Sequence, residues 1–172
     1  MPPSTSSTIR TAFGILIFVK NLYQNSQLLT QKDFKKLEKA FEYAWSKETT
    51  SPIIEDEWSE DNKAYGQCAI TALIICDLYG GRIIYDKGNL HVWNELPDGT
   101  QQDFSRKQYK EDLIFTIYKY KTKGDLLSDN YGRKTQITPR YQLLKQRLEA
   151  KLKRLKFNVN SLVILLPLNR LR

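Results

Sequence analysis

The sequence has few of the residues that build metal centres, disulfide frameworks or phosphate-binding loops. Its 172 residues include two cysteines and one histidine, which are too few for the usual zinc-binding sets, and no glycine-rich phosphate loop occurs. The two cysteines, Cys68 and Cys76, would lie about 12 Å apart on one helix, too far for a disulfide bond. We therefore expect two free thiols, no metal and no cofactor, and free thiols favour a cytoplasmic protein.

Long apolar runs are also absent. Residues 12–19 are apolar, but a helix needs about 20 such residues to cross a bilayer, so we expect no transmembrane span. A secretion signal, an upstream extension and a short packed segment all remain open for this run, and we favour a peripheral extension. We divide the chain into an N-terminal extension (residues 1–28), a catalytic-like domain (residues 29–156) and a short C-terminal tail (residues 157–172).

The composition is that of a globular protein whose charge is unevenly distributed. Hydrophobic residues make up 41% of the chain, enough for one packed domain of ordinary size. Residues 1–118 carry 13 basic and 16 acidic side chains, whereas residues 119–172 carry 14 basic and 3 acidic ones. The net charge of +8 therefore originates in the C-terminal part of the chain.

The most informative segment begins at Gly66-Gln67-Cys68 and continues into an apolar run. Residues 69–76 have the length and side-chain mix of a buried helix, which a pair of glycines then ends. Cys68 would lie in the first turn, where the helix dipole and unpaired N–H groups favour a thiolate and can hold an oxyanion. Cys68 is therefore a candidate nucleophile, with Gly66 and the Gln67 side chain as candidate supports for the oxyanion.

The only histidine, His91, lies in a segment of alternating residues that predicts a strand with His91 and Trp93 on one face. Pro97 and Gly99 then fit a three-residue hairpin loop, in which Trp93 pairs with Asp103 and the carboxylate lies diagonal to the imidazole. A two-residue loop would turn Asp103 to the other face, and the proline favours the first register. Asp103 could then orient His91 toward the thiol.

Each of these residues also has an ordinary structural interpretation. A cysteine at the start of an apolar helix is usually a small buried residue, a lone histidine on a strand is usually half-buried, and Asp103 could simply precede a helix. The joint occurrence of Cys68, His91 and Asp103 in this order favours a catalytic triad.

Three further residues are candidates for supporting roles. Trp93 shares the face of His91, whereas alternation points Asn94, a reserve candidate for the orienting role, to the opposite face. Trp58 lies in an acidic loop before the cysteine and is a candidate wall of the substrate site, although such loops are more often merely solvated.

Two other helices are predicted outside this segment. Thr30-Gln31-Lys32-Asp33 is typical of a capping box and starts a core-packing helix, and Thr138-Pro139 starts a helix to about Lys156 with a leucine face. The segment 124–132 between them is predicted to be a loop. The opposite face of the last helix is basic and could bind nucleic acid or an anionic surface, although solvation is the commoner outcome. We expect this basic part to be dispensable for the chemistry.

Taken together, the motifs resemble those of the bacterial YunG-like proteins. They include Gly66-Gln67-Cys68-Ala69-Ile70-Thr71-Ala72, His91-Val92-Trp93-Asn94 and the segment from Pro97 to Tyr109, and the similarity covers roughly residues 29–155. The order of cysteine, histidine and aspartate in this family resembles the papain-like and transglutaminase-like fold. The resemblance therefore implies an α+β protein in which a cysteine-bearing helix packs on a small antiparallel sheet.

Two functions follow from these observations. The first is a cysteine hydrolase or acyltransferase that acts on an amide- or ester-bearing substrate through Cys68, His91 and Asp103. The alternative is a non-catalytic binding module that uses its basic C-terminal part on nucleic acid or another acidic partner. A close approach of Cys68 to His91 in a cleft open to solvent would favour the enzyme.

Overall fold

The computed structural model describes residues 31–109, 111–128 and 130–154. The predicted N-terminal extension, the C-terminal tail and the last two residues of the predicted C-terminal helix lie outside these ranges. The helices are α2 (Gln31–Ala44), α3 (Cys68–Tyr79), α4 (Lys123–Ser128), α5 (Asn130–Lys134) and α6 (Ile137–Arg154). The strands are β1 (Arg82–Asp86), β2 (His91–Glu95), β3 (Gln101–Gln102) and β4 (Lys119–Lys121). Three 3-10 turns are η1 (Lys47–Thr49), η2 (Glu55–Glu57) and η3 (Arg106–Gln108).

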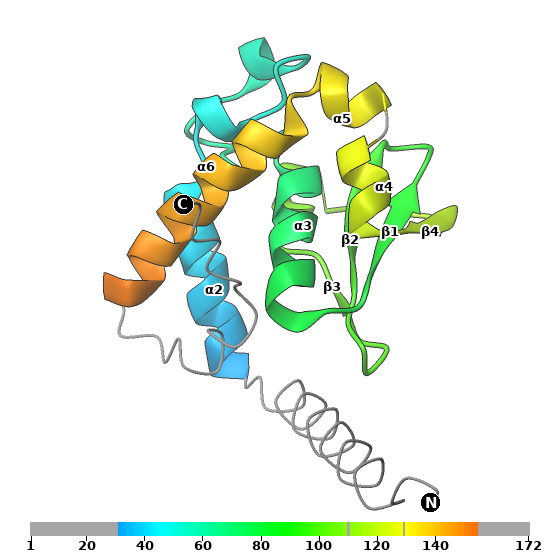
Figure 1. Cartoon of the computed structure of the whole chain (residues 1–172), viewed down its shortest axis with the longest axis horizontal. Helices are drawn as coiled ribbons and strands as arrows, with labels where there is room; N and C mark the ends of the chain where they lie inside the picture. The colour runs from blue at the N-terminus through cyan, green and yellow to red at the C-terminus, as the bar shows by residue number, and fades with distance from the viewer. Residues whose placement is uncertain (1–30, 110, 129, 155–172) are drawn as a thin grey trace, which may run out of the picture.

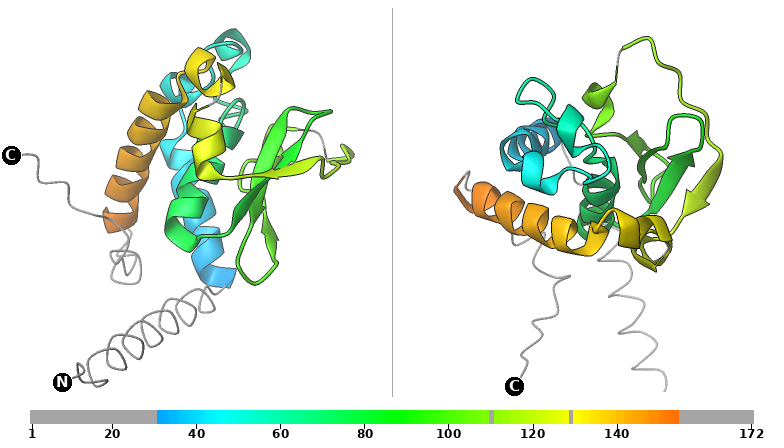
Figure 2. Two further views of the ribbon diagram at one scale, coloured as in Figure 1. Left: turned by 45° about the vertical axis from the view of Figure 1, so that its right-hand side comes forward. Right: turned by 90° about the horizontal axis from the view of Figure 1, so that it is seen from above.

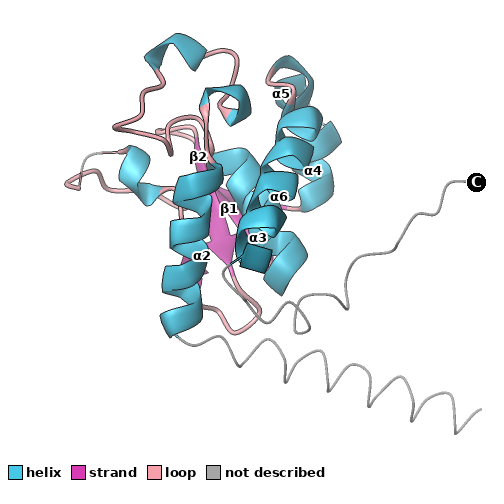
Figure 3. Ribbon diagram, turned by 90° about the vertical axis from the view of Figure 1, so that its left-hand side faces the viewer, coloured by secondary structure: helices cyan, strands magenta, loops and turns pink. Residues whose placement is uncertain are grey.

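The helix α3 lies at the centre of the molecule, between the sheet and the crossed pair α2 and α6 (Figure 1). The two turned views in Figure 2 keep this order of layers, and Figure 3 shows the sheet behind the helices. Nine of the twelve residues of α3 are buried, because an apolar helix must be covered on every side. The protein is therefore an α+β fold whose cysteine-bearing helix packs on a small antiparallel sheet, as expected.

The four strands form an antiparallel sheet in the order β3-β2-β1-β4. Asn94 of β2 pairs with Gln102 of β3, and the Leu96 N–H donates to the Thr100 carbonyl at 2.8 Å in the loop between them. The three-residue loop predicted from the proline and glycine of this turn is confirmed, and so is the register that it sets.

Two polar contacts fix α3 to its neighbours on opposite sides. The Trp45 indole N–H, just after α2, donates to the Thr71 hydroxyl at 3.1 Å. The Asn94 amide of β2 donates to the Ala72 carbonyl at 3.0 Å. Because these groups are buried, each bond would be costly to leave unmade, and together they fix the position of α3 along its own axis.

The segment 124–132 is not a loop, contrary to the prediction. It contains most of α4 and the first part of α5. The Thr122 N–H donates to the Asp125 carboxylate at 2.6 Å and the Asp125 N–H donates to the Thr122 hydroxyl at 3.2 Å, which is a reciprocal capping box. Gly124 and Gly132 at the two ends of the segment favour a loop. The sequence Thr122-Lys123-Gly124-Asp125, however, is typical of a capping box and favours the start of a helix.

No helix within the described residues is both long and apolar enough to cross a membrane.

The start of β1 gives a test of how closely the backbone packs on β2. Gly81 has φ +85°, and an added Cβ would lie 2.2 Å from the Glu95 carbonyl oxygen. Gly99 has a similar φ of +84° with no atom within 4 Å of an added Cβ. Gly99→Ala should lower the free energy of unfolding by about 1–2 kcal/mol through backbone strain, and Gly81→Ala by about 3 kcal/mol or more because a clash is added. Urea denaturation measures both, and equal losses would contradict this packing.

Candidate active site

Cys68 is the first residue of α3, and the turn before it requires a glycine. Gly66 has φ +72°, and an added Cβ would lie 2.3 Å from the hydroxyl oxygen of Thr50. That hydroxyl donates to the Tyr65 carbonyl at 2.5 Å, so it cannot easily move aside. Gly66 therefore lets the chain turn into α3 and places Cys68 at the helix N-terminus. Cys68 is nearly buried there, with 8% of its surface exposed to solvent.

A buried arginine from α6 supports the same turn. The Arg140 guanidinium donates to the carbonyls of Gly66, Thr135 and Thr49 at 2.8, 2.8 and 3.0 Å. These carbonyls come from chain segments far apart in sequence, so one side chain fixes α6 against the loop that leads to Cys68. The basic C-terminal part thus supplies one side chain that contacts the loop before Cys68, and its expected dispensability for the chemistry stays a prediction.

His91 is fully buried at the start of β2 and contacts Asp103. The Nε2 atom of His91 lies 2.7 Å from Oδ2 of Asp103. The other carboxylate oxygen accepts from the N–H and the hydroxyl of Ser105, both at 3.1 Å. The carboxylate is thus held by bonds on both oxygens and faces the imidazole, as the hairpin register predicts.

Three aromatic rings surround the imidazole. Trp93 stacks on His91 with centroids 5.6 Å apart and planes at 20°, in keeping with their shared face. Phe115 and Tyr109 lie 4.7 and 5.0 Å from the same ring. Neither Phe115 nor Tyr109 was a candidate from sequence. Their contacts with His91 depend on how the chain between η3 and β4 folds back over the sheet, and no local sequence pattern predicts that fold.

The electrostatic environment of His91 is set by opposing effects. Burial lowers the pKa of His91, but the hydrogen bond that the Asp103 carboxylate accepts, the hydrogen bond with Cys68 and the charges of these two groups raise it, with a net result of about 9. The thiol and the carboxylate therefore both act on the same imidazole. This shared dependence joins Cys68, His91 and Asp103 into one electrostatic unit.

The other candidates have contacts elsewhere. The Gln67 amide donates to the Ser46 carbonyl at 3.0 Å, and its buried oxygen has no hydrogen-bond partner among the described residues. That oxygen is an acceptor and cannot stabilise an oxyanion, which also accepts. Asn94 donates to the sulfur of Cys76 at 3.3 Å on the far side of β2, as alternation predicted. The Trp58 indole donates to the carbonyl of Lys63 within its own loop, at 3.2 Å.

Besides Arg140, a second polar residue at the site was missed in the sequence. Gln108, at the end of η3, is buried and its amide nitrogen lies 3.4 Å from Nδ1 of His91. Its amide oxygen accepts from the Gly66 N–H at 3.3 Å. The segment from Asp103 to Tyr109 carried part of the family resemblance, and this was the only signal that pointed to Gln108.

Comparisons with known proteins place this α+β chain in a family. A family model described as YunG protein matches residues 33–153, and the chain belongs to the YunG family. The Uncharacterized protein YunG of Bacillus subtilis (strain 168) is 32% identical over 74 residues, which cover 42% of this chain and 59% of that relative. The chain thus spans about three fifths of the length of the relative it matches. No solved structure matches the chain significantly.

The two free thiols should differ in reactivity. The less exposed thiol, Cys68, should react faster than the more exposed thiol, Cys76. Cys76 is the more exposed thiol, but burial is the largest influence on it and raises its pKa to about 11, opposed in part by the Asn94 hydrogen bond. Cys68 is nearly covered but is the first residue of α3 and interacts with His91. Alkylation with iodoacetamide at pH 6, read by peptide mapping, should modify Cys68 at least about tenfold faster.

The control is the His91→Ala variant, in which labelling of Cys68 should slow and labelling of Cys76 should not change. Circular dichroism of the variant verifies that the fold is retained. Preferential labelling of Cys76 in the wild type would mean that exposure, and not the environment of His91, decides the reactivity of these thiols.

Proposed function

We propose that this protein is a thiol hydrolase or acyltransferase that acts on an amide- or ester-bearing substrate. The observation that carries the proposal is the 2.7 Å contact of Asp103 with a buried histidine that also interacts with the Cys68 thiol. Nucleophile, base and orienting acid are the parts that such chemistry needs. The packing of a cysteine-bearing helix on an antiparallel sheet supports a likeness to papain-like and transglutaminase-like enzymes.

In this proposal His91 carries protons between the thiol and the substrate. It accepts the proton of Cys68, whose sulfur then bonds to the carbonyl carbon while electrons move onto the carbonyl oxygen. The bond to the amine or alcohol breaks, and the imidazolium of His91 donates its proton to that leaving group. Water or a second amine then loses a proton to His91, attacks the thioester and releases the thiol.

The first turn of α3 is the place for the developing oxyanion. Its unpaired N–H groups and the positive end of the helix dipole lie beside Cys68 and would stabilise a negative oxygen. The Gln67 side chain, occupied with Ser46, is a poorer donor for this role than the N–H of Cys68 itself.

Access to the three groups is restricted. His91 is fully buried, Cys68 is 8% exposed and the Asp103 side chain is 16% exposed. Burial of the base excludes water from the reacting groups and strengthens the interactions among them.

The orienting role of Asp103 is testable against a second aspartate of the same hairpin. Asp103→Asn should lower kcat/KM by at least about a hundredfold, because an amide cannot balance the charge of the imidazolium and can favour the wrong tautomer. Asp98→Asn makes the same change at an exposed turn position and should leave kcat/KM nearly unchanged. Hydrolysis of p-nitrophenyl esters and of a panel of amides provides the assay.

Two results would count against Asp103. One is a variant that is folded and as active as the wild type. The other is an equal loss in the Asp98 variant, which would attribute the effect to the hairpin and not to the carboxylate beside His91.

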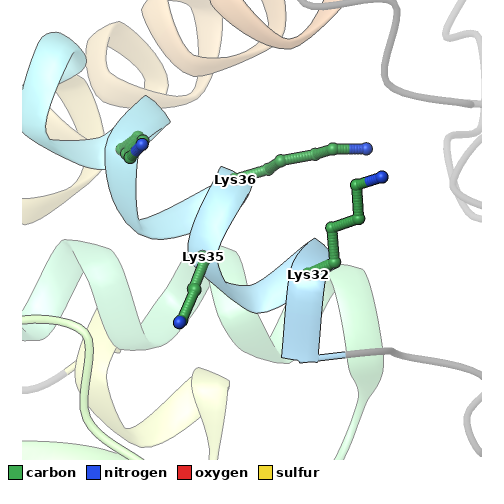
Figure 4. Close-up of a pocket in the computed structure, with 4 residues that line it drawn as sticks. Lys32, Lys35 and Lys36 are labelled. Atoms are coloured by element: carbon green, nitrogen blue, oxygen red, sulfur yellow. The ribbon is translucent and has the colours of Figure 1, made fainter.

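A second candidate function, binding of an anionic partner such as nucleic acid, is favoured by one observation. Four lysines of α2 line a shallow hollow on that helix (Figure 4), and a second hollow beside α6 is lined largely by basic residues. Because α2 packs on α6, these two basic hollows lie on neighbouring helices that are distant in sequence. The members are Lys32, Lys35, Lys36, Lys39, Arg147, Lys151 and Arg154, and we call them the α2/α6 basic face.

Part of this basic face already has intramolecular contacts. Arg147 pairs with Glu48, and the Lys151 ammonium lies 3.7 Å from the ring centroid of Tyr43. Lys36 also pairs with Asp33 at 3.8 Å. These contacts reduce the charge available to a partner, so the exposed Lys32, Lys35 and Lys39 would contribute most of the binding.

Binding to the basic face should depend steeply on salt. Each phosphate contact releases counterions, so the affinity for a fluorescein-labelled DNA duplex should fall as salt rises. The double variant Lys35→Glu/Lys39→Glu should weaken binding and reduce the salt dependence, whereas Lys87→Glu/Lys119→Glu, an equal charge change on the sheet side, should not. Fluorescence anisotropy measures both. Salt-independent binding, or equal losses in the two variants, would exclude this use of the face.

A further inference from the structure

Gln108 connects the two halves of the candidate site. Its amide nitrogen contacts Nδ1 of His91 at 3.4 Å and the Ser105 carbonyl at 3.2 Å, and its amide oxygen accepts from the Gly66 N–H at 3.3 Å. Its own main-chain carbonyl accepts from the Asn62 amide at 3.2 Å. One residue therefore bonds both the loop that precedes the nucleophile and the ring of the base.

The neighbours of Gln108 determine which way its amide points. A main-chain N–H, that of Gly66, can only donate, so the group facing it must be the amide oxygen. A carbonyl, that of Ser105, can only accept, so the group facing it must be the NH2. Reversing the amide would break both bonds, and the group that faces Nδ1 of His91 is therefore a donor.

A donor at Nδ1 is compatible with only one protonation state of the imidazole. The ring must present a lone pair at Nδ1, and its proton must then lie on Nε2, where the Asp103 carboxylate accepts it. This is the neutral tautomer that can take a proton from a thiol. An imidazolium would instead place an N–H against the NH2 of Gln108, which is unfavourable.

We propose that Gln108 is a positioning residue that holds Nδ1 of His91 as a proton acceptor for Cys68. The proposal rests on the thiol chemistry proposed above and deepens it, because it specifies how the base is kept ready. The long contacts, 3.2 to 3.4 Å, suit a group that must release Nδ1 once the proton arrives. The second hydrogen of the amide remains on Ser105 throughout.

The balance of charges around His91 explains why such a residue is needed. Burial lowers the pKa of His91, whereas the hydrogen bonds and charges of Asp103 and Cys68 raise it, to a net value of about 9. The NH2 of Gln108 lies at Nδ1 and, as a donor, disfavours a proton on that nitrogen.

The other polar and charged groups close to the ring are fixed by bonds of their own. Asp86, opposite His91 in the sheet, accepts main-chain N–H groups. The Tyr109 hydroxyl donates to the Asn89 carbonyl. The Arg106 guanidinium donates to the carbonyls of residues 111 and 113 and lies over the Phe115 ring. These groups are constant across the variants below, so a change in His91 can be assigned to Gln108.

The test uses the only histidine of the chain as a single NMR signal. The full-length Cys68→Ala protein, labelled with 15N-histidine, removes the thiol and leaves Gln108 and Asp103 as the ring's hydrogen-bonding neighbours. Above its pKa, His91 should show a protonated Nε2 and an unprotonated Nδ1. Gln108→Glu in this background replaces the NH2 donor with an oxygen and should raise the pKa of His91 by at least about one unit, a tenfold change in proton affinity.

Two further variants make the result specific. Gln108→Met removes the donor without adding charge and should raise the pKa by less, with a mixture of both neutral tautomers. Gln102→Glu adds the same charge on β3, where the side chain makes no contact with His91 that the structure records, and should have little effect. An unchanged pKa and tautomer in folded Gln108 variants would overturn the proposal, as would a protonated Nδ1 in the neutral ring of the Cys68→Ala protein, which needs no Gln108 variant to fold.

Failure of the proposed function would look different. If His91 behaves as described but the wild type turns over no ester or amide, the role of Gln108 in setting the tautomer is supported and the hydrolase proposal is contradicted. Loss of activity on Asp103→Asn, together with an NMR signal insensitive to Gln108, would support the hydrolase proposal and contradict the role of Gln108.

Discussion

The fold depends on the need to cover an apolar helix on every side. Helix α3 has no polar stripe that could face water, so it is stable only between two layers, the sheet on one side and α2 with α6 on the other. Burial on every side does not favour one rotation of the helix, so the bonds from Trp45 and Asn94 set both its rotation and its axial position. The location of Cys68 is a consequence, because it is the residue at which the buried helix begins.

The polar groups near Cys68 are arranged around the cost of burying them. His91, Gln108 and Arg140 are all buried, and each would be destabilising without partners. Their partners come largely from the main chain of the turns at Gly66 and Ser105 and from the Asp103 carboxylate. The same bonds that satisfy these groups therefore hold the loop before Cys68, His91 and Asp103 in fixed relation.

Sequence patterns were sufficient where a local rule determined the geometry. The turn between β2 and β3 fixed the pairing that brings Asp103 to His91, because a side chain's face in a strand depends only on counting from the loop. The contacts of Gln108 and Arg140 could not be found this way, since they join segments whose separation is set by packing. The oxyanion-supporting role expected of Gln67 rested on its position next to Cys68 in the sequence. In the structure its side chain points toward η1 and donates to the Ser46 carbonyl.

In the proposed chemistry, the reactivity of Cys68 depends on three segments and not on the helix terminus alone. A thiol at the start of a helix gains a modest preference for its anion, whereas the position of the shared proton depends on what contacts the two imidazole nitrogens. Asp103 attracts the proton to Nε2 and the amide of Gln108 leaves Nδ1 without one. Asp103 and Gln108 lie twelve and seventeen positions after His91 in the sequence. Both follow the β2–β3 hairpin, so in this proposal the geometry of that hairpin and of η3 decides whether His91 can act as a base.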